Sequence, residues 1–208
     1  MYYLVDMYND KTNFIDGIDS DTCQKILNSS TIISETLEFY YLGKCVSDSF
    51  DTLIQWSYSA NPSSNYIMRN LHTAERLVRG FLFELRTCLD HMETKIKQDY
   101  GKTSEFLKVF EDSTHATYNA HPEYAFTYHL RNVSQHCQNI VHGFNSPTGI
   151  GISCNVQKLL NEYDKWKPVD KDYMINSGEN VDLLKTFSVA FQAFNEALIP
   201  VIRYLLNT

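Results

Sequence analysis

The stretch at residues 65–99, NYIMRNLHTAERLVRGFLFELRTCLDHMETKIKQD, decides the fold class because its apolar residues recur at alternating steps of four and three. That spacing places them on one side of an α-helix with about 3.6 residues per turn. The stripe comprises Ile67, Leu71, Ala74, Val78, Phe81, Leu85, Cys88 and Met92. Gly101 follows at a point where such a helix would end. The sequence therefore predicts a long helix over 65–99 with one face in a core.

Two further apolar stripes have the same helical period. One follows Pro122, a residue favoured in the first helical turn, and comprises Phe126, Leu130, Val133, Cys137 and Ile140. The other comprises Leu184, Phe187, Phe191, Phe194, Leu198, Val201 and Leu205, and we expect Pro200 to kink it. Less regular patterns predict helices over 31–59 and 103–119. The polar segment 166–179 is interpreted as a connector.

These stripes predict a mainly α protein, built as an antiparallel bundle of four to five helices. We expect a single helical domain over 1–208, with a motif-bearing core at about 65–145 and a C-terminal helix at about 181–207. Two short apolar segments, at about 2–7 and 150–156, are typical of strands. We expect them to pair with each other in one small two-stranded sheet.

Composition places the chain in an ordinary globular class. It has 208 residues, 43% hydrophobic and 21% charged, which is enough for one sizeable core. No run of roughly 18 apolar residues predicts a membrane span, and the first residues lack a secretion signal, so we expect a cytoplasmic protein without a membrane partner. The five cysteines are scattered and odd in number, which favours neither a disulfide framework nor a zinc site.

Charge is distributed unevenly in this acidic chain. The net charge of -7 argues against a broad basic surface for nucleic acid, although it leaves room for one local phosphate site. Residues 124–161 contain no Asp or Glu, and their only Lys or Arg residues are Arg131 and Lys158. No acidic residue close to Arg131 in the sequence would repel an anion bound there.

The predicted helix after Pro122 has an unusual polar face. Instead of lysine and glutamate it carries Tyr128, His129, Asn132, Gln135, His136 and Asn139, with Arg131 as the only formal charge. Arginine presents a planar fork that matches phosphate oxygens, and an imidazole exchanges protons near neutral pH. Arg131 and His136 could therefore act on one phosphodiester without a metal, with Asn132 orienting either group. The same spacing also occurs in helices whose arginine is solvated and whose histidine packs at the core edge.

The motif Arg131-Asn132-x-x-x-His136 on a late helix resembles the signature of the HEPN-like superfamily, over roughly residues 81–144 at best. The resemblance implies a helical bundle and a homodimer whose two motifs share one cleft. It also implies metal-independent endoribonuclease activity on single-stranded RNA, by 2′-hydroxyl attack, in a toxin–antitoxin or phage-defence context. Arg131 would stabilise the phosphate, Asn132 would orient and His136 would be the acid or base. An antitoxin or other protein partner is then expected. A subgroup of the family is regulated through a tyrosine two positions after the histidine; here that position is Gln138, so this form of regulation is not expected.

A second group of residues could extend the same site. Three residues lie outside the core stripe of the helix predicted over 65–99: Arg79, Arg86 and His91. If this helix meets the one after Pro122, we expect them to bind substrate together with Tyr128 and His129. The alternative is a solvated face with ordinary ion pairs. No pair of histidines has the His-x3-His spacing of helical zinc sites, so neither metal nor cofactor is expected. Two other functions remain open: a non-catalytic dimerisation or interaction module, and a nucleotide sensor that uses Arg131 for phosphate.

Overall fold

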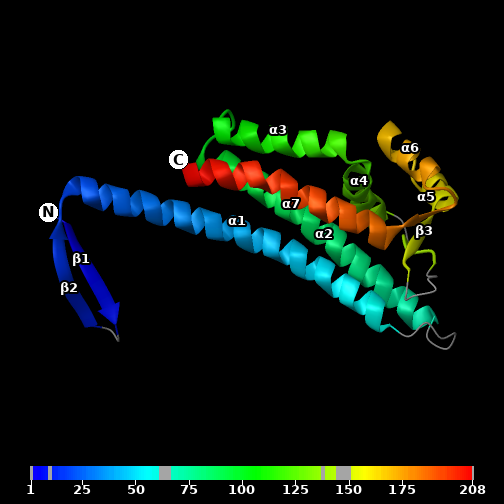
Figure 1. Cartoon of the computed structure of the whole chain (residues 1–208), viewed down its shortest axis with the longest axis horizontal. Helices are drawn as coiled ribbons and strands as arrows, with labels where there is room; N and C mark the ends of the chain where they lie inside the picture. Colours follow the sequence, from blue (N-terminus) through cyan, green and yellow to red (C-terminus); the bar gives the residue numbers. More distant parts are fainter. Residues whose placement is uncertain (1, 9–10, 61–66, 137–138, 144–150, 208) are drawn as a thin grey trace. The chain divides into compact units, whose positions relative to one another are not determined.

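The computed structural model describes residues 2–8, 11–60, 67–136, 139–143 and 151–207, and Figure 1 shows its elements. In chain order they are β1 (Tyr2–Tyr8), β2 (Lys11–Ile18), α1 (Ser20–Ser59), α2 (Ile67–Asp99), α3 (Glu105–Ala120), α4 (Pro122–His136), β3 (Ser153–Asn155), α5 (Val156–Glu162), α6 (Pro168–Asn176), β4 (Asn180–Asp182) and α7 (Leu183–Asn207). The fold is mainly α, as the helical periodicity predicts.

The chain forms two compact units, Met1–Tyr40 and Tyr41–Thr208. The first unit contains an antiparallel hairpin, in which Tyr2 pairs with Ile18 and Tyr8 with Lys11. The expected pairing of 2–7 with 150–156 is therefore wrong. A hairpin closes a short loop, which costs less chain entropy than joining distant segments.

The second unit contains the other small sheet. β3 pairs antiparallel with β4, with Cys154 opposite Val181. The strand expected at 150–156 is thus confined to Ser153–Asn155, because Val156 already begins α5; Ile150 lies outside the described residues. The segment 166–179 is not a simple connector, since it contains α6. Pro168 in the first turn and the Asp170 carboxylate, which accepts the N–H of Lys167, start that helix.

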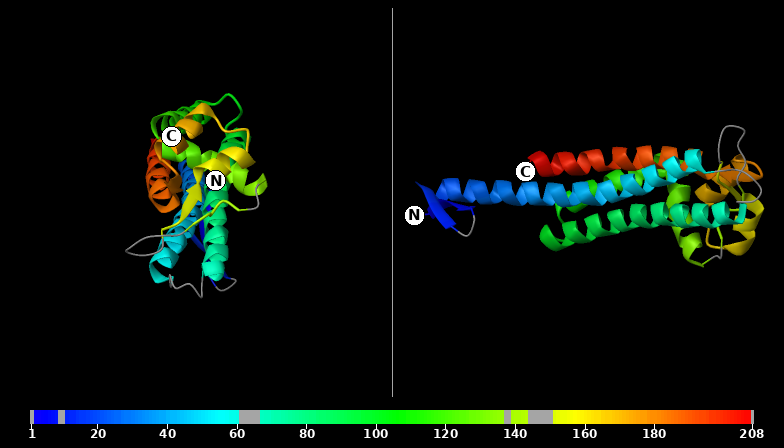
Figure 2. Two further views of the ribbon diagram at one scale, coloured as in Figure 1. Left: turned by 90° about the vertical axis from the view of Figure 1, so that its right-hand side faces the viewer. Right: turned by 90° about the horizontal axis from the view of Figure 1, so that it is seen from below.

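The core of the second unit lies among α2, α4, α7 and the second half of α1. Figure 1 shows α3 running along α7 and α4 beside one end of α7, and Figure 2 shows the same helices from two other sides. Phe81 contacts Phe50 and Phe187, with ring centroids 5.5 and 5.0 Å apart. The predicted stripes supply buried residues from each helix: Val78, Phe81 and Leu85; Phe126, Leu130 and Val133; Phe187, Phe194 and Val201.

Helix α7 is the one described helix that is long and apolar enough to cross a membrane, by length and composition alone. Phe187 and Phe194 on this helix are buried inside the bundle. Packing in the core of the second unit therefore accounts for the buried face of α7, whereas Ile199 and Leu206 of the same helix are exposed. The helix continues through Pro200, and the expected kink there stays a prediction.

Candidate functional site

Helix α4 carries the motif residues Arg131, Asn132 and His136 outside its buried face. His121 ends α3 and Pro122 begins α4 at once, so the two helices join without a loop. Leu130 and Val133 are fully buried, and they hold the opposite side of α4 against the core. Arg131 and Asn132 are half-buried, whereas His136, the last residue of the helix, is exposed.

The guanidinium of Arg131 is bound to a neutral group. Its Nη1 donates to Oε1 of Gln135 at 2.6 Å, and no carboxylate pairs with Arg131 among the residues that the structure describes. Within those residues Arg131 and His136 also make no hydrogen bond with each other. In one chain, the Arg131 guanidinium and the His136 imidazole therefore lie toward the same end of α4 without a hydrogen bond between them.

Arg79 is engaged inside the fold. Its Nε donates to Oε1 of Glu75 at 2.7 Å, and its Nη1 donates to the backbone carbonyl of Ser134 on α4. The Glu75 carboxylate also accepts the N–H groups of Ile140 and Val141, the latter at 2.8 Å. These contacts fix α2 to the end of α4, so the geometry gives Arg79 a structural role.

Arg86 contacts α4, as we expected if the face of α2 that carries it extends the site on α4. Its Cζ lies 4.3 Å from the ring centroid of Tyr128, and its Nε donates to Oδ2 of Asp90 at 3.0 Å. A guanidinium over a tyrosine face is attracted by the ring quadrupole. His91 is exposed on α2 and, in the part of the chain that the structure describes, forms no hydrogen bond, ion pair or ring contact with Tyr128 or Arg86. The structure thus brings Arg86 and Tyr128 together and leaves His91 apart.

His129 is tied to a carboxylate that sequence analysis missed. Nδ1 of His129 lies 2.7 Å from Oδ2 of Asp170, and the two side chains are 14% and 0% exposed. The hydroxyl of Tyr118 lies 3.4 Å from the same Nδ1, and burial together with the Asp170 charge raises the pKa of Tyr118. Oδ1 of Asp170 is buried and has no hydrogen-bond partner among the described residues. His129 therefore links α4 to α6. Although residues 124–161 contain no Asp or Glu, the fold places the Asp170 carboxylate against α4.

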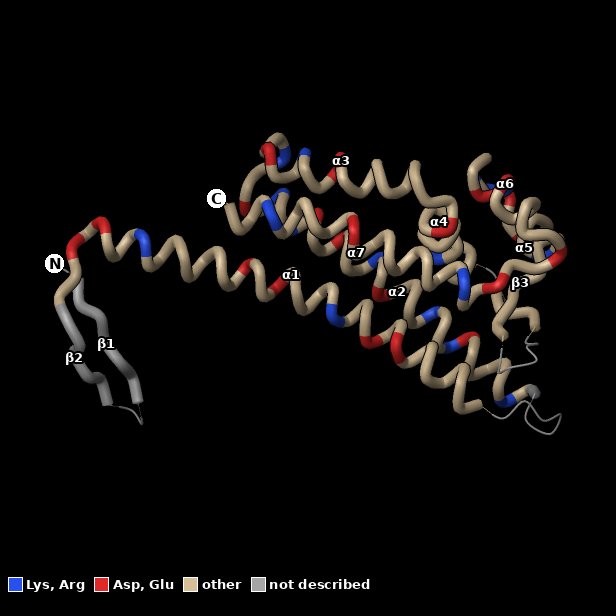
Figure 3. Tube along the Cα trace, in the orientation of Figure 1, with Lys and Arg blue, Asp and Glu red and all other residues tan. Residues whose placement is uncertain are grey.

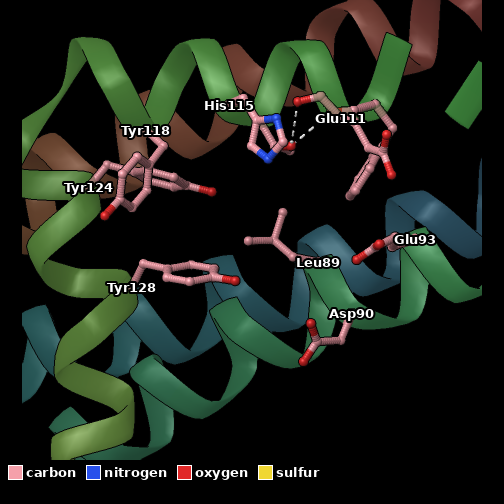
Figure 4. A pocket seen from close by; sticks show the side chains of 10 residues that line it. Leu89, Asp90, Glu93, Glu111, His115, Tyr118, Tyr124 and Tyr128 are labelled. Atoms are coloured by element: carbon pink, nitrogen blue, oxygen red, sulfur yellow. Dashed lines mark hydrogen bonds between the residues drawn. The ribbon is translucent and has the colours of Figure 1, made fainter. Parts of the chain in front are cut away.

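A cleft of about 330 Å³ opens between α2, α3 and α4 (Figure 4). Tyrosines gather at one end of it, and carboxylates at the other, above a floor that includes Leu89. The lining includes Tyr118, Tyr124, Tyr128, Asp90, Glu93 and Glu111. Sequence analysis did not find this cleft, because its walls come from three helices and no local pattern relates them.

The described residues hold no group of three His, Cys, Asp or Glu side chains suited to a metal ion. Burial raises the pKa of Cys88 and of Cys154 to about 12, so both thiols stay protonated and unreactive near neutral pH. Charges of both signs are spread along α2, whereas those of α3 lie in its first half, up to Asp112 (Figure 3). The groups nearest the motif are guanidinium, imidazole, amide and phenol groups, together with the Asp170 carboxylate that is bound to His129.

Comparisons with protein-family models, with curated proteins and with solved structures found no match to this chain. Function must therefore be argued from the site, since a helical bundle by itself fits many activities.

Proposed function

We propose that the chain is a metal-independent endoribonuclease of the HEPN type that cleaves single-stranded RNA in the cytoplasm, in a toxin or phage-defence context. The observation that carries the proposal is the state of Arg131. Its guanidinium donates a hydrogen bond to the neutral side chain of Gln135. By contrast, Arg79 pairs with the carboxylate of Glu75, and Arg86 pairs with that of Asp90. A cation that has no carboxylate partner within the described residues, and that lies about one and a half turns from an exposed histidine, is suited to a phosphate.

The proposed reaction needs a cation and a proton carrier. The 2′-oxygen attacks the neighbouring phosphorus, the bond to the 5′-oxygen breaks, and a 2′,3′-cyclic phosphate and a 5′-hydroxyl form. Arg131 stabilises the charge that develops on the phosphate oxygens. His136 takes the 2′-hydroxyl proton or returns one to the leaving oxygen, and Asn132 orients the phosphate or the imidazole.

A second copy of the chain would complete this site. One chain supplies one exposed imidazole on α4, whereas cleavage uses a base and an acid. A symmetric homodimer that pairs the two α4 ends would bring a second His136 and a second Arg131 to the same phosphate. The dimer is part of the proposal, and an antitoxin or other partner would act by covering this groove.

Incubation of the full chain with single-stranded RNA and a chelator tests the proposal. His136→Ala should lower the cleavage rate by about 10²–10⁴-fold, the usual contribution of an acid or base. Arg131→Ala should lower it by about 10²–10³-fold, as for loss of one charge-stabilising donor. His72→Ala, which removes an exposed histidine from α2, is the matched control and should cleave normally.

Cleavage that survives in the Arg131→Ala/His136→Ala double variant would rule out this site. Analytical ultracentrifugation of the same variants separates the other function considered. If the parent chain forms a dimer but never cleaves RNA, and His136→Ala dissociates it, the α4 face is a non-catalytic interaction surface.

A further inference from the structure

We infer that the cleft between α2, α3 and α4 binds a primary alkylammonium group, independently of any action on RNA. The cleft of about 330 Å³ lies within the range of small-molecule sites, which is roughly 300–1,000 Å³. Its apolar floor includes Leu89 and Phe110, which suits the methylene groups of such a ligand. The charge, the free hydroxyl and the aromatic wall of the cleft each point to a cation.

The carboxylates of the cleft are incompletely neutralised. Asp90 holds the guanidinium of Arg86 at 3.0 Å, and Glu93 holds the ammonium of Lys97. Glu111 on α3 lines the same cleft beside His115; it makes no ion pair within the described residues, although it interacts with the charge of Lys97. A cation entering the cleft would therefore gain the Glu111 carboxylate as a partner, whereas an anion would be repelled.

Tyr124 supplies an independent indication of a ligand. Its side chain is only 2% exposed, and no hydrogen bond joins its hydroxyl to another of the described residues. Figure 4 shows this hydroxyl pointing into the cleft rather than into the core. The hydroxyl is not one of the fully enclosed polar atoms, so a ligand N–H donor in the cleft would take the place of water as its partner. Burial raises the pKa of Tyr124, which keeps the phenol neutral and able to accept a hydrogen bond from an N–H donor.

The aromatic wall accepts cations in the structure itself. The guanidinium of Arg86 lies 4.3 Å from the centroid of the Tyr128 ring. Tyr118 meets that ring edge to face, with centroids 6.2 Å apart. A positive group between Tyr124 and Glu111 would thus combine a hydroxyl acceptor, a carboxylate and nearby aromatic faces. This is the environment that recognises ammonium groups.

Two sources could supply the ammonium group, a free aliphatic amine or a lysine side chain. Titration calorimetry at low salt with putrescine tests the first and Nα-acetyl-lysine methylamide the second. The neutral isostere 1,4-butanediol is the ligand control. Binding of either amine, but not of the diol, is the expected result and identifies the source. Binding of the diol as tightly as of the amines, or of none of the three, would overturn the inference.

Variants on α3 and α4 locate the site. Glu111→Gln should weaken the amine Kd by about tenfold, the effect of losing one charge-assisted hydrogen bond. Tyr124→Phe should weaken it about fivefold, because only a neutral acceptor is lost. Asp112→Asn, an exposed neighbour of Glu111 outside the cleft, is the matched control and should bind as the parent chain does.

Equal weakening by Glu111→Gln and Asp112→Asn would mean that the amine follows the overall negative charge, and it would contradict a site in the cleft. Circular dichroism of each variant establishes that it is folded. Because binding is measured without RNA, its outcome is independent of whether Arg131 and His136 cleave RNA.

Discussion

The carboxylate of Asp170 holds Nδ1 of His129 at 2.7 Å, with both side chains withdrawn from solvent. The same carboxylate oxygen accepts the backbone N–H of Lys167 at 3.0 Å, at the start of α6. One buried acid therefore begins α6 and fixes it to α4. Because Arg131 and Asn132 lie two and three residues after His129 on the same helix, this contact also sets where the motif residues lie.

Replacing His129 tests the strength of this link. His129→Ala should lower the free energy of unfolding by about 3–5 kcal/mol, because it leaves the Asp170 charge buried without its partner. Urea denaturation measures the loss. His121→Ala is the matched control: His121 lies 4.0 Å from Glu196 and both side chains are exposed, so its loss should stay below about 1 kcal/mol. Similar losses in the two variants would show that the buried pair is weak.

The sequence was sufficient to predict α2 and α7, whereas α1 begins at Ser20, well before the predicted start at residue 31. Their apolar residues repeat over many turns, as in the stripe from Ala74 to Met92, and the buried residues of α2 follow that stripe. Helices α5 and α6 are too short, at 7 and 9 residues, for a period to emerge. Their signals were local instead: Asn155 caps α5 through the N–H of Lys158, and Pro168 opens α6.

The candidate site was only partly predictable for a different reason. Periodicity places Arg131 and His136 outside the buried face of their own helix, and the structure agrees. It carries no information about what a neighbouring helix brings to that face. Asp170 reaches His129 from α6, and Arg86 reaches Tyr128 from α2, through tertiary packing alone. The acid-free appearance of the sequence around Arg131 is therefore not the electrostatic environment of α4 in the fold.

Glu75 and Arg131 should differ sharply in their effect on stability. Glu75→Ala removes the acceptor of the Ile140 and Val141 N–H groups and the partner of Arg79. Each buried donor left unsatisfied costs about 1–3 kcal/mol, so unfolding should become easier by roughly 2–4 kcal/mol. Arg131→Ala loses one exposed hydrogen bond and should stay within about 0.5 kcal/mol of the parent chain. Urea midpoints compare the two; a large loss in Arg131→Ala would assign that residue to the fold instead of to a site.

Thiol alkylation should separate the cysteines by their burial. Cys88 and Cys154 are 1% and 0% exposed, and burial raises the pKa of each to about 12. At pH 8 only about 10⁻⁴ of such a thiol is the reactive thiolate. Iodoacetamide should therefore modify the exposed Cys45 in the folded chain and spare these two, as peptide mass spectrometry would reveal. After unfolding in guanidinium all three should react alike; rapid labelling of Cys154 beforehand would mean that its surroundings open readily.

His142 should make the stability of the chain depend on pH. Burial, and then the Lys158 charge, lower its pKa below the ordinary value of 6.5, and its Nδ1 accepts the N–H of Asn155 at 2.9 Å. As the pH falls below about 6.5, the unfolded chain binds a proton at this position before the folded chain does, so protonation favours unfolding. The stabilising contribution is thus present above that pH and is lost on the way down to the folded pKa.

The substitution His142→Asn isolates this contribution, because the amide oxygen can replace Nδ1 as an acceptor but does not titrate. Urea denaturation at a series of pH values should give parallel stabilities for the two proteins above the ordinary histidine pKa. Below it, the parent chain should lose stability faster than the variant, since only its unfolded state gains the proton. Parallel curves over the whole range would mean that the imidazole binds protons equally well in both states, and that burial beside Lys158 does not disfavour its charged form.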